Sequence, residues 1–144
     1  ALFYNDYDNL QAFSQPGTPF VREGTVLTPF PFANLGEAST YGVEIAPGWS
    51  VTDTWRLSGS YSFLMQDFEL NSNAFAYYTS GTSPKHQASL RSYLNLSKTV
   101  QWDAAAYYVS SLNGGIGSYM RLDTRLGWQA LPNVELSLIG MNLL

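Results

Sequence analysis

Charged side chains alternate along one segment near the carboxyl-terminal end, and they are the first residues whose types could do chemistry. Arg121, Asp123 and Arg125 are spaced two residues apart in the run YMRLDTRLGW. On a β-strand, such residues share one face and lie about 6.8 Å apart. They could hold an anionic substrate, or they could pair with one another and keep a solvated face polar; the second interpretation is favoured. The same interpretation applies to Glu44, Arg56, Arg91 and Asp103.

Metal and catalytic chemistry find little support. His86 is the only histidine and cysteine is absent, whereas a metal site needs several converging ligands. A Ser–His pair would have to use His86, and neither a GxSxG elbow nor a glycine-rich phosphate loop is present. No pattern singles out a catalytic pair of carboxylates. We therefore expect neither an enzyme nor a bound cofactor.

Phe75, Tyr77 and Tyr78 form an aromatic cluster in a segment that reads as a loop. Aromatic rings bind flat or cationic ligands through stacking and cation–π contacts. The cluster is therefore a candidate contact for an aromatic chelator or a sugar. Tyrosines are equally expected at the base of a loop or at a membrane interface, so the structural alternative stays open.

The element around which the rest of the chain is organised is the stretch 41–66, YGVEIAPGWSVTDTWRLSGSYSFLMQ, which carries Glu44 and Arg56. Its apolar and polar side chains alternate, which predicts two strands joined by a short turn at Val51–Thr54, each with one apolar face. These faces are longer than a typical soluble strand and suit the roughly 9–11 residues of a strand that crosses a bilayer. A turn centred at Thr52 predicts this register: Trp49 opposite Trp55, Val43 opposite Tyr61, and Glu44 opposite Ser60.

The rest of the chain alternates between strand-like segments and breaks. Four prolines in residues 14–35 indicate a long loop with a short strand near Thr25–Thr28, since proline rarely sits inside a paired strand. No helix-period stretch competes. The expected strands are residues 1–13, His86–Ser97, Val100–Leu112, Ser118–Ala130 and Val134–Leu144, and the expected connections are Glu69–Lys85, Lys98–Thr99, Asn113–Gly117 and residues 131–133.

The composition and the connection lengths point to a membrane barrel. Charged residues make up 12% of the chain, about half of the usual 25%, and there is no apolar run long enough for a transmembrane helix. The net charge of −4 with dispersed basic residues gives no nucleic-acid footprint. Long and short connections alternate, as in transmembrane barrels. All four tryptophans fall beside the short turns, which predicts an aromatic girdle at one membrane interface: Trp49, Trp55, Trp102 and Trp128.

About seven strands are expected, whereas bacterial single-chain barrels have even numbers. We therefore predict an all-β fold: an antiparallel meander that is one arc of a larger transmembrane outer-membrane β-barrel. The chain also lacks a signal peptide at its start and stops at Asn142-Leu143-Leu144 just after a strand. Both features favour an internal fragment.

Several ordered segments resemble the carboxyl-terminal part of TonB-dependent outer-membrane receptors, which import siderophores and other scarce nutrients. The resemblance covers nearly the whole chain. It is carried by FYNDYDNLQ (Phe3–Gln11), NLGEASTYGVEIAPGW (Asn34–Trp49), WRLSGSYSFL (Trp55–Leu64), SPKHQASLRSYLNL (Ser83–Leu96) and YMRLDTRLGWQALPNVELSLIGMNLL (Tyr119–Leu144).

The resemblance implies that the protein is located in the bacterial outer membrane and that this segment forms part of the barrel wall of an active transporter. It implies contacts with lipid, with a plug domain of the same protein, with the TonB complex through the amino-terminal TonB box, and with a small ligand such as an iron chelate. Plug, TonB box and the family's final strand are absent from residues 1–144. The resemblance also implies that the strand face with Arg121 lines the barrel lumen, where it could contact the plug. The alternatives are a small complete barrel serving as an anchor or adhesin, an outer-membrane lipid-modifying enzyme, or a soluble carbohydrate-binding sheet.

Overall fold

The computed structural model describes residues 1–75 and 82–144. Within these ranges the protein is built from strands and connections, and it contains no helix long and apolar enough to cross a membrane. The strands are β1 (Leu2–Ser14), β2 (Phe20–Arg22), β3 (Thr25–Leu27), β4 (Phe32–Ile45), β5 (Gly48–Ser50), β6 (Trp55–Leu70), β7 (Ala74–Phe75), β8 (His86–Asn95), β9 (Val100–Val109), β10 (Tyr119–Leu131) and β11 (Val134–Gly140).

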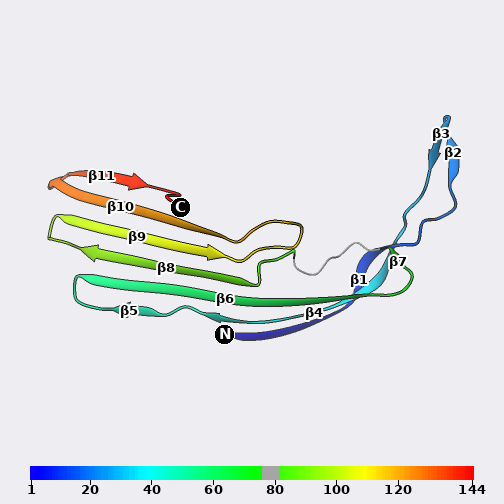
Figure 1. Cartoon of the computed structure of the whole chain (residues 1–144), viewed down its shortest axis with the longest axis horizontal. Helices are drawn as coiled ribbons and strands as arrows, with labels where there is room; N and C mark the ends of the chain where they lie inside the picture. The colour runs from blue at the N-terminus through cyan, green and yellow to red at the C-terminus, as the bar shows by residue number, and fades with distance from the viewer. Residues whose placement is uncertain (76–81) are drawn as a thin grey trace.

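Nine of these strands form one antiparallel sheet in the order β11-β10-β9-β8-β6-β4-β1-β7, with β5 paired to β6. The seven strands of at least seven residues follow one another along the chain, as in a meander. The sheet is open, because β11 and β1 do not pair with each other, and the separate β2–β3 hairpin protrudes from one end as an arm (Figure 1). The prediction of an antiparallel arc with about seven strands is confirmed.

The sheet is a single layer and therefore has almost no core. The only buried hydrophobic side chains among the described residues are Ala12 and Ala38, and large apolar side chains such as Leu90 and Leu138 are more than half exposed. Soluble domains bury an apolar sheet face against a second layer. The apolar face of this sheet must be covered by something other than the described residues.

The central hairpin has its predicted turn but a different register. Val43 lies opposite Phe63, Glu44 opposite Ser62, and Trp49 opposite Leu57; the predicted partners were wrong by two residues. The turn is wider than expected, because the Val51 N–H donates to the Trp55 carbonyl over 2.9 Å. Its centre is therefore Asp53. A shift of two residues keeps every side chain on its predicted face.

Several strands extend beyond their predicted ends. β4 begins at Phe32, where a loop to residue 35 was expected, and β6 runs to Leu70. The first predicted strand of the hairpin is divided into β4 and β5 by Ala46–Pro47, where the Pro47 carbonyl still accepts the Gly59 N–H over 2.9 Å. β9 ends at Val109 and β11 at Gly140, short of their predicted limits. The expected short strand near Thr25 is β3.

Two irregular positions explain where the alternation of the sequence fails. Asn9 adopts a left-handed φ of 59°, and the pairing of β1 with β4 shifts between Tyr7 and Leu10. At the other end of the chain Asn142 has a φ of 54°, and the Leu143 N–H donates to the Leu122 carbonyl over 3.0 Å. That bond is one residue out of step with the register that pairs Thr124 with Gly140. The shift beside Asn9 is a β-bulge, and a second shift between Leu10 and Gln11 returns the residues that follow to the original register.

Candidate functional site

The sheet brings all seven predicted charged residues onto one face, which we call the polar face. Arg56, Tyr93, Asp103 and Arg125 lie opposite one another in a row that crosses β6, β8, β9 and β10. The rest belong to other rows of the same face: Arg91 and Asp123 on either side of Ala105, Arg121 opposite Tyr107, and Glu44 opposite Ser62.

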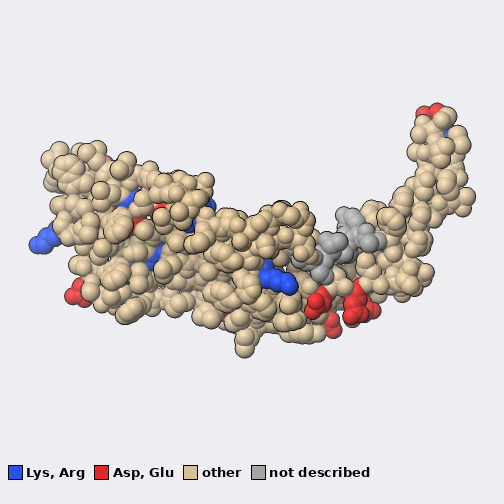
Figure 2. Space-filling view, viewed as in Figure 1, with Lys and Arg blue, Asp and Glu red and all other residues tan. Residues whose placement is uncertain are grey.

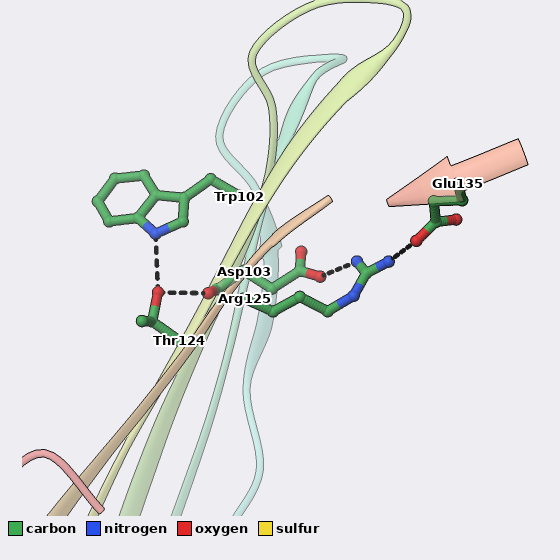
Figure 3. Close-up of polar contacts among 5 residues, drawn as sticks. All are labelled: Trp102, Asp103, Thr124, Arg125 and Glu135. Atoms are coloured by element: carbon green, nitrogen blue, oxygen red, sulfur yellow. Dashed lines mark hydrogen bonds and ion pairs between the residues drawn. The ribbon is translucent and has the colours of Figure 1, made fainter. Parts of the chain in front are cut away.

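Arg125 is the centre of the best-connected cluster on this face. Its Nη1 donates to Asp103 Oδ2 over 3.1 Å, and its Nη2 donates to Glu135 Oε1 of β11 (Figure 3). The side chain passes over Gly127, where a Cβ would lie 2.9 Å from Nη2. Sequence reasoning missed Glu135, because only the register of β11 brings it to Arg125. The cluster joins three strands by two ion pairs.

The other guanidinium groups have different surroundings. Arg121 pairs with Asp123 over 3.0 Å and lies 4.3 Å above the ring centre of Tyr107. Arg56 lies 5.1 Å from the ring centre of Tyr93, and Arg91 lies 5.8 Å from that of Tyr107. Within residues 1–75 and 82–144, neither Arg56 nor Arg91 takes part in an ion pair.

The opposite face, which we call the apolar face, carries aromatic and aliphatic side chains along the middle of the strands. Val43 lies beside Phe63, Ile45 beside Tyr61, and Tyr61 beside Ala88. Leu94, Trp102, Leu126 and Leu138 form a further row. Within the stretch 41–66, these positions have the parity that the sequence predicts for an apolar face.

The four tryptophans lie on the apolar face at the end of the sheet that carries the short turns. Two of them satisfy their indole N–H within the sheet: Trp55 donates to Ser92 Oγ and Trp102 to Thr124 Oγ1, each over 2.9 Å. Thr124 in turn donates to the Asp103 carbonyl over 3.0 Å (Figure 3). The hydroxyls of Ser92 and Thr124 thus serve as acceptors for two of the four tryptophans.

Carboxylates bound the apolar face at the end away from the tryptophans. Asp6 and Asp67 flank Ser39, and Glu69 lies opposite Glu37; Figure 2 shows acidic side chains gathered toward the arm. From Trp55 to Met65, ahead of Asp67, β6 covers about 34 Å at roughly 3.4 Å per residue. A tilt of about 45° reduces this length to about 24 Å, close to the apolar band of roughly 25 Å in transmembrane barrels.

His86 lies on the apolar face rather than in a cluster of ligands. Its Nδ1 and the Tyr61 hydroxyl share a hydrogen bond of 2.9 Å, and its ring centre is 5.2 Å from that of Phe63. No group of three or more His, Asp or Glu residues among those described could hold a metal ion. In the structure His86 thus belongs to an aromatic contact.

Of the predicted aromatic loop cluster, the structure describes only Phe75; Tyr77 and Tyr78 lie outside the described residues. Phe75 is in β7, opposite Phe13 of β1. It is about half exposed, and its ring centre is 5.4 Å from that of Phe30. Phe13 also stacks on Phe32 at 4.4 Å. Phe75 therefore belongs to a phenylalanine cluster at the base of the arm, which the run Phe30-Pro31-Phe32 could have signalled.

Comparisons with known proteins agree with this geometry. A family model described as TonB-dependent receptor-like β-barrel matches residues 1–143. A probable TonB-dependent siderophore receptor, PiuA of Acinetobacter baumannii, is 26% identical over 136 residues, covering 81% of this chain and 18% of that protein. The crystal structure of the ferric-catecholate import receptor Fiu from K12 E. coli, in its closed form, aligns with a TM-score of 0.69 at 21% identity, over 99% of this chain and 20% of that one. The chain thus spans about a fifth of the length of these relatives.

Proposed function

The chain belongs to the TonB-dependent receptor-like β-barrel family, and from this we propose that it forms part of the barrel wall of an outer-membrane transporter for an iron–siderophore complex. The observation that carries the proposal is the two-faced single layer, with an apolar band about as tall as a membrane and charged groups on the other face. The names of the relatives PiuA and Fiu support a siderophore as the ligand class.

In this arrangement the apolar face meets lipid and the polar face lines the lumen. A charge on a lipid-facing strand position costs about 2–4 kcal/mol at the membrane midplane. The arginines of the sheet avoid that cost, because Arg56, Arg91, Arg121 and Arg125 all lie on the polar face. The tryptophans would then lie at the periplasmic interface, where the apolar part of the indole ring can contact lipid while its N–H finds a polar partner.

The orientation follows from the connections. The short turns lie at the tryptophan end of the sheet, and the long connections and the arm lie at the opposite end (Figure 1). The carboxylates lie toward the arm as well (Figure 2), and this end is expected to be the extracellular side of such a barrel. Ligand contacts are therefore expected in the outer segments, with Phe75, Tyr77 and Tyr78 as candidates. The ring contact between Phe75 and Phe30 makes Tyr77 and Tyr78 the sharper test.

The remaining parts of the transport cycle belong to the rest of the full-length protein. We expect a plug domain inside the barrel, touching the polar face, and a TonB complex that releases the ligand by acting on the plug. Because these parts lie outside residues 1–144, this segment alone is not expected to transport. A small complete barrel is not favoured, since the chain spans only a fifth of the matched structure.

The test is uptake of radioactive ferric siderophore by cells that carry the full-length receptor under iron limitation. Uptake should require TonB and a proton gradient. Tyr77→Ala combined with Tyr78→Ala should lower uptake without changing surface expression, whereas Thr79→Ala with Ser80→Ala, the next two residues in the sequence, should leave uptake unchanged. Arg121→Ala should have a smaller effect than the tyrosine pair. Uptake that persists without TonB would refute the transporter, and normal uptake in the tyrosine variant would refute the ligand contact alone.

A further inference from the structure

A groove on the apolar face lies over β9, β10 and β11 near the tryptophan end of the sheet. It has a volume of about 470 Å³, within the roughly 300–1,000 Å³ of clefts that hold small ligands. Most of the side chains that line it are apolar, and its lining includes Leu96, Trp102, Thr124, Leu126, Leu138 and Gly140. A groove of this composition fits a hydrocarbon chain.

The two polar groups of this lining satisfy each other. The Trp102 indole N–H donates to Thr124 Oγ1 over 2.9 Å, and the Thr124 hydroxyl donates to the Asp103 carbonyl over 3.0 Å. Gly140, which lies opposite Thr124, adds no side chain. The groove therefore offers an occupant apolar contact and leaves no polar group of its lining to be paired.

A cation lies just beyond the groove at the tryptophan end. Lys98 is at the tip of the turn between β8 and β9, two residues past Leu96, and it is exposed. The turn is well ordered by hydrogen bonds: the Ser97 N–H donates to the Val100 carbonyl over 3.2 Å, and Ser97 Oγ accepts the Val100 N–H over 3.0 Å. The flexible stem of a lysine can place its ammonium group at the depth of the lipid headgroups.

Lys98 is not neutralised by the residues that the structure describes, since none of their ion pairs includes it. Asp53, the charged residue of the neighbouring short turn, lines a separate cavity together with Arg56 and Tyr93 of the polar face. A free ammonium group at the end of an apolar groove complements a phosphate that is joined to an acyl chain.

We propose that this groove holds one acyl chain of a phospholipid of the periplasmic leaflet, and that Lys98 binds the phosphate of the same lipid. The site rests on the proposed function in two respects: the apolar face must meet lipid, and the tryptophan end must face the periplasm. It adds a preferred anionic lipid at one place on the barrel wall.

The experiment places the full-length receptor in phosphatidylcholine vesicles that contain a small share of phosphatidylglycerol with a diazirine in one acyl chain. After illumination, mass spectrometry compares the crosslink yield at Trp102 with that at Leu57, which lies in the same row of the sheet as Thr124. The yield should be higher at Trp102. Diacylglycerol with the same diazirine, which lacks the phosphate, should show no such preference.

The two lysines of the chain give a matched pair of variants. Lys98→Gln should lower the yield at Trp102 about five-fold, the factor that corresponds to about 1 kcal/mol for a lysine beside anionic lipid. Lys85→Gln removes the same charge at the opposite end of β8 and should leave the yield unchanged.

A second pair of variants tests the groove itself. Leu138→Trp should fill the groove and lower the yield at Trp102, whereas Leu2→Trp, on β1, should not; the two leucines are 75% and 84% exposed, so both sites can accept the larger ring. Equal yields at Trp102 and Leu57, or a yield at Trp102 that either Lys98→Gln or Leu138→Trp leaves unchanged, would overturn the lipid site alone. Absence of crosslinks at both positions would overturn the lipid facing as well, and with it the proposed barrel wall.

Discussion

Gly127 leaves room for the guanidinium group of Arg125 to reach both of its partners, and this geometry predicts a change of sign in a double-mutant cycle. A Cβ at position 127 would lie 2.9 Å from Nη2 and 3.1 Å from Cζ of Arg125. Gly127→Ala should therefore push the end of the arginine away from Asp103 and Glu135. In an Arg125→Ala background the same substitution meets no guanidinium group.

The magnitudes follow from the exposure of the groups. The side chains of Arg125 and Asp103 are 30% exposed and that of Glu135 is 47% exposed, so each ion pair contributes about 0.2–1 kcal/mol. Replacing a strand glycine by alanine otherwise stabilises by roughly 0.5–1 kcal/mol. Gly127→Ala should therefore raise the free energy of unfolding by about 0.5–1 kcal/mol in the Arg125→Ala background. In the native background that gain should be cancelled or reversed, which gives a coupling of about 1 kcal/mol.

The assay is equilibrium urea unfolding of the full-length receptor in lipid vesicles, followed by tryptophan fluorescence, for all four members of the cycle. Distant sites add within about 0.3–0.5 kcal/mol. A coupling below that limit would refute the claim that Gly127 positions the guanidinium group between its two carboxylates.

Three further predictions use simpler comparisons. Thr124→Val should cost about 1–2 kcal/mol of unfolding free energy, because the Trp102 indole N–H loses its acceptor at the edge of the apolar band, and Thr124→Ser should retain most of the stability; loss of stability in both would contradict this. Asn142→Val should destabilise by about 1–2 kcal/mol, since a β-branched residue disfavours a φ of 54°, whereas Asn142→Gly should be tolerated; equal stability of the two variants would show that the left-handed conformation at this position does not matter. Residues 1–144 alone should not give a monodisperse, heat-modifiable species in detergent, because β1 and β11 leave open edges, and a folded monomer by gel filtration and gel shift would contradict the arc.

The facing of the strands could be read from the sequence because period two is a strong signal. The predicted partner of Val43 was two residues away from Phe63, the residue that the structure shows, yet both candidates have the same parity. An even error in register leaves the faces unchanged. The single layer with one charged and one apolar face was therefore predictable even where individual pairs were not.

Strand ends were harder to predict, and the reason is physical. Beyond the apolar band neither face has to be apolar, so the stretches that extend β4 back to Phe32 and β6 out to Leu70 carry no regular alternation. Bulges such as that at Asn9 also interrupt the period without ending the strand. The alternation of apolar and polar residues depends on lipid contact. It therefore stops at the edge of the apolar band, although the strand continues.

The partners within the polar face needed three-dimensional information. The contact between Arg125 and Glu135 joins the neighbouring strands β10 and β11 at an offset of four residues, since Glu135 lies opposite Gln129. The sequence shows Arg121, Asp123 and Arg125 on one strand, but it does not show which arginines are paired. Among residues 1–75 and 82–144, Arg121 and Arg125 form ion pairs, and Arg56 and Arg91 do not. Which charges remain available is decided by register and side-chain direction together.

The central claim is that one face of this sheet meets lipid and the other lines the lumen, and one pair of adjacent substitutions on β6 tests it most directly. Tyr61 lies on the apolar face opposite Ile45 and Ala88, near the middle of the band, whereas Ser60 lies on the polar face, 2.7 Å from the Ser89 hydroxyl. In the full-length receptor, Tyr61→Arg should impair assembly, since an arginine there costs about 2–4 kcal/mol in hydrocarbon, and Ser60→Arg should assemble normally. The measurement is the heat-modifiable gel shift together with surface expression. Normal assembly of the Tyr61 variant, or equal impairment of both variants, would contradict the account.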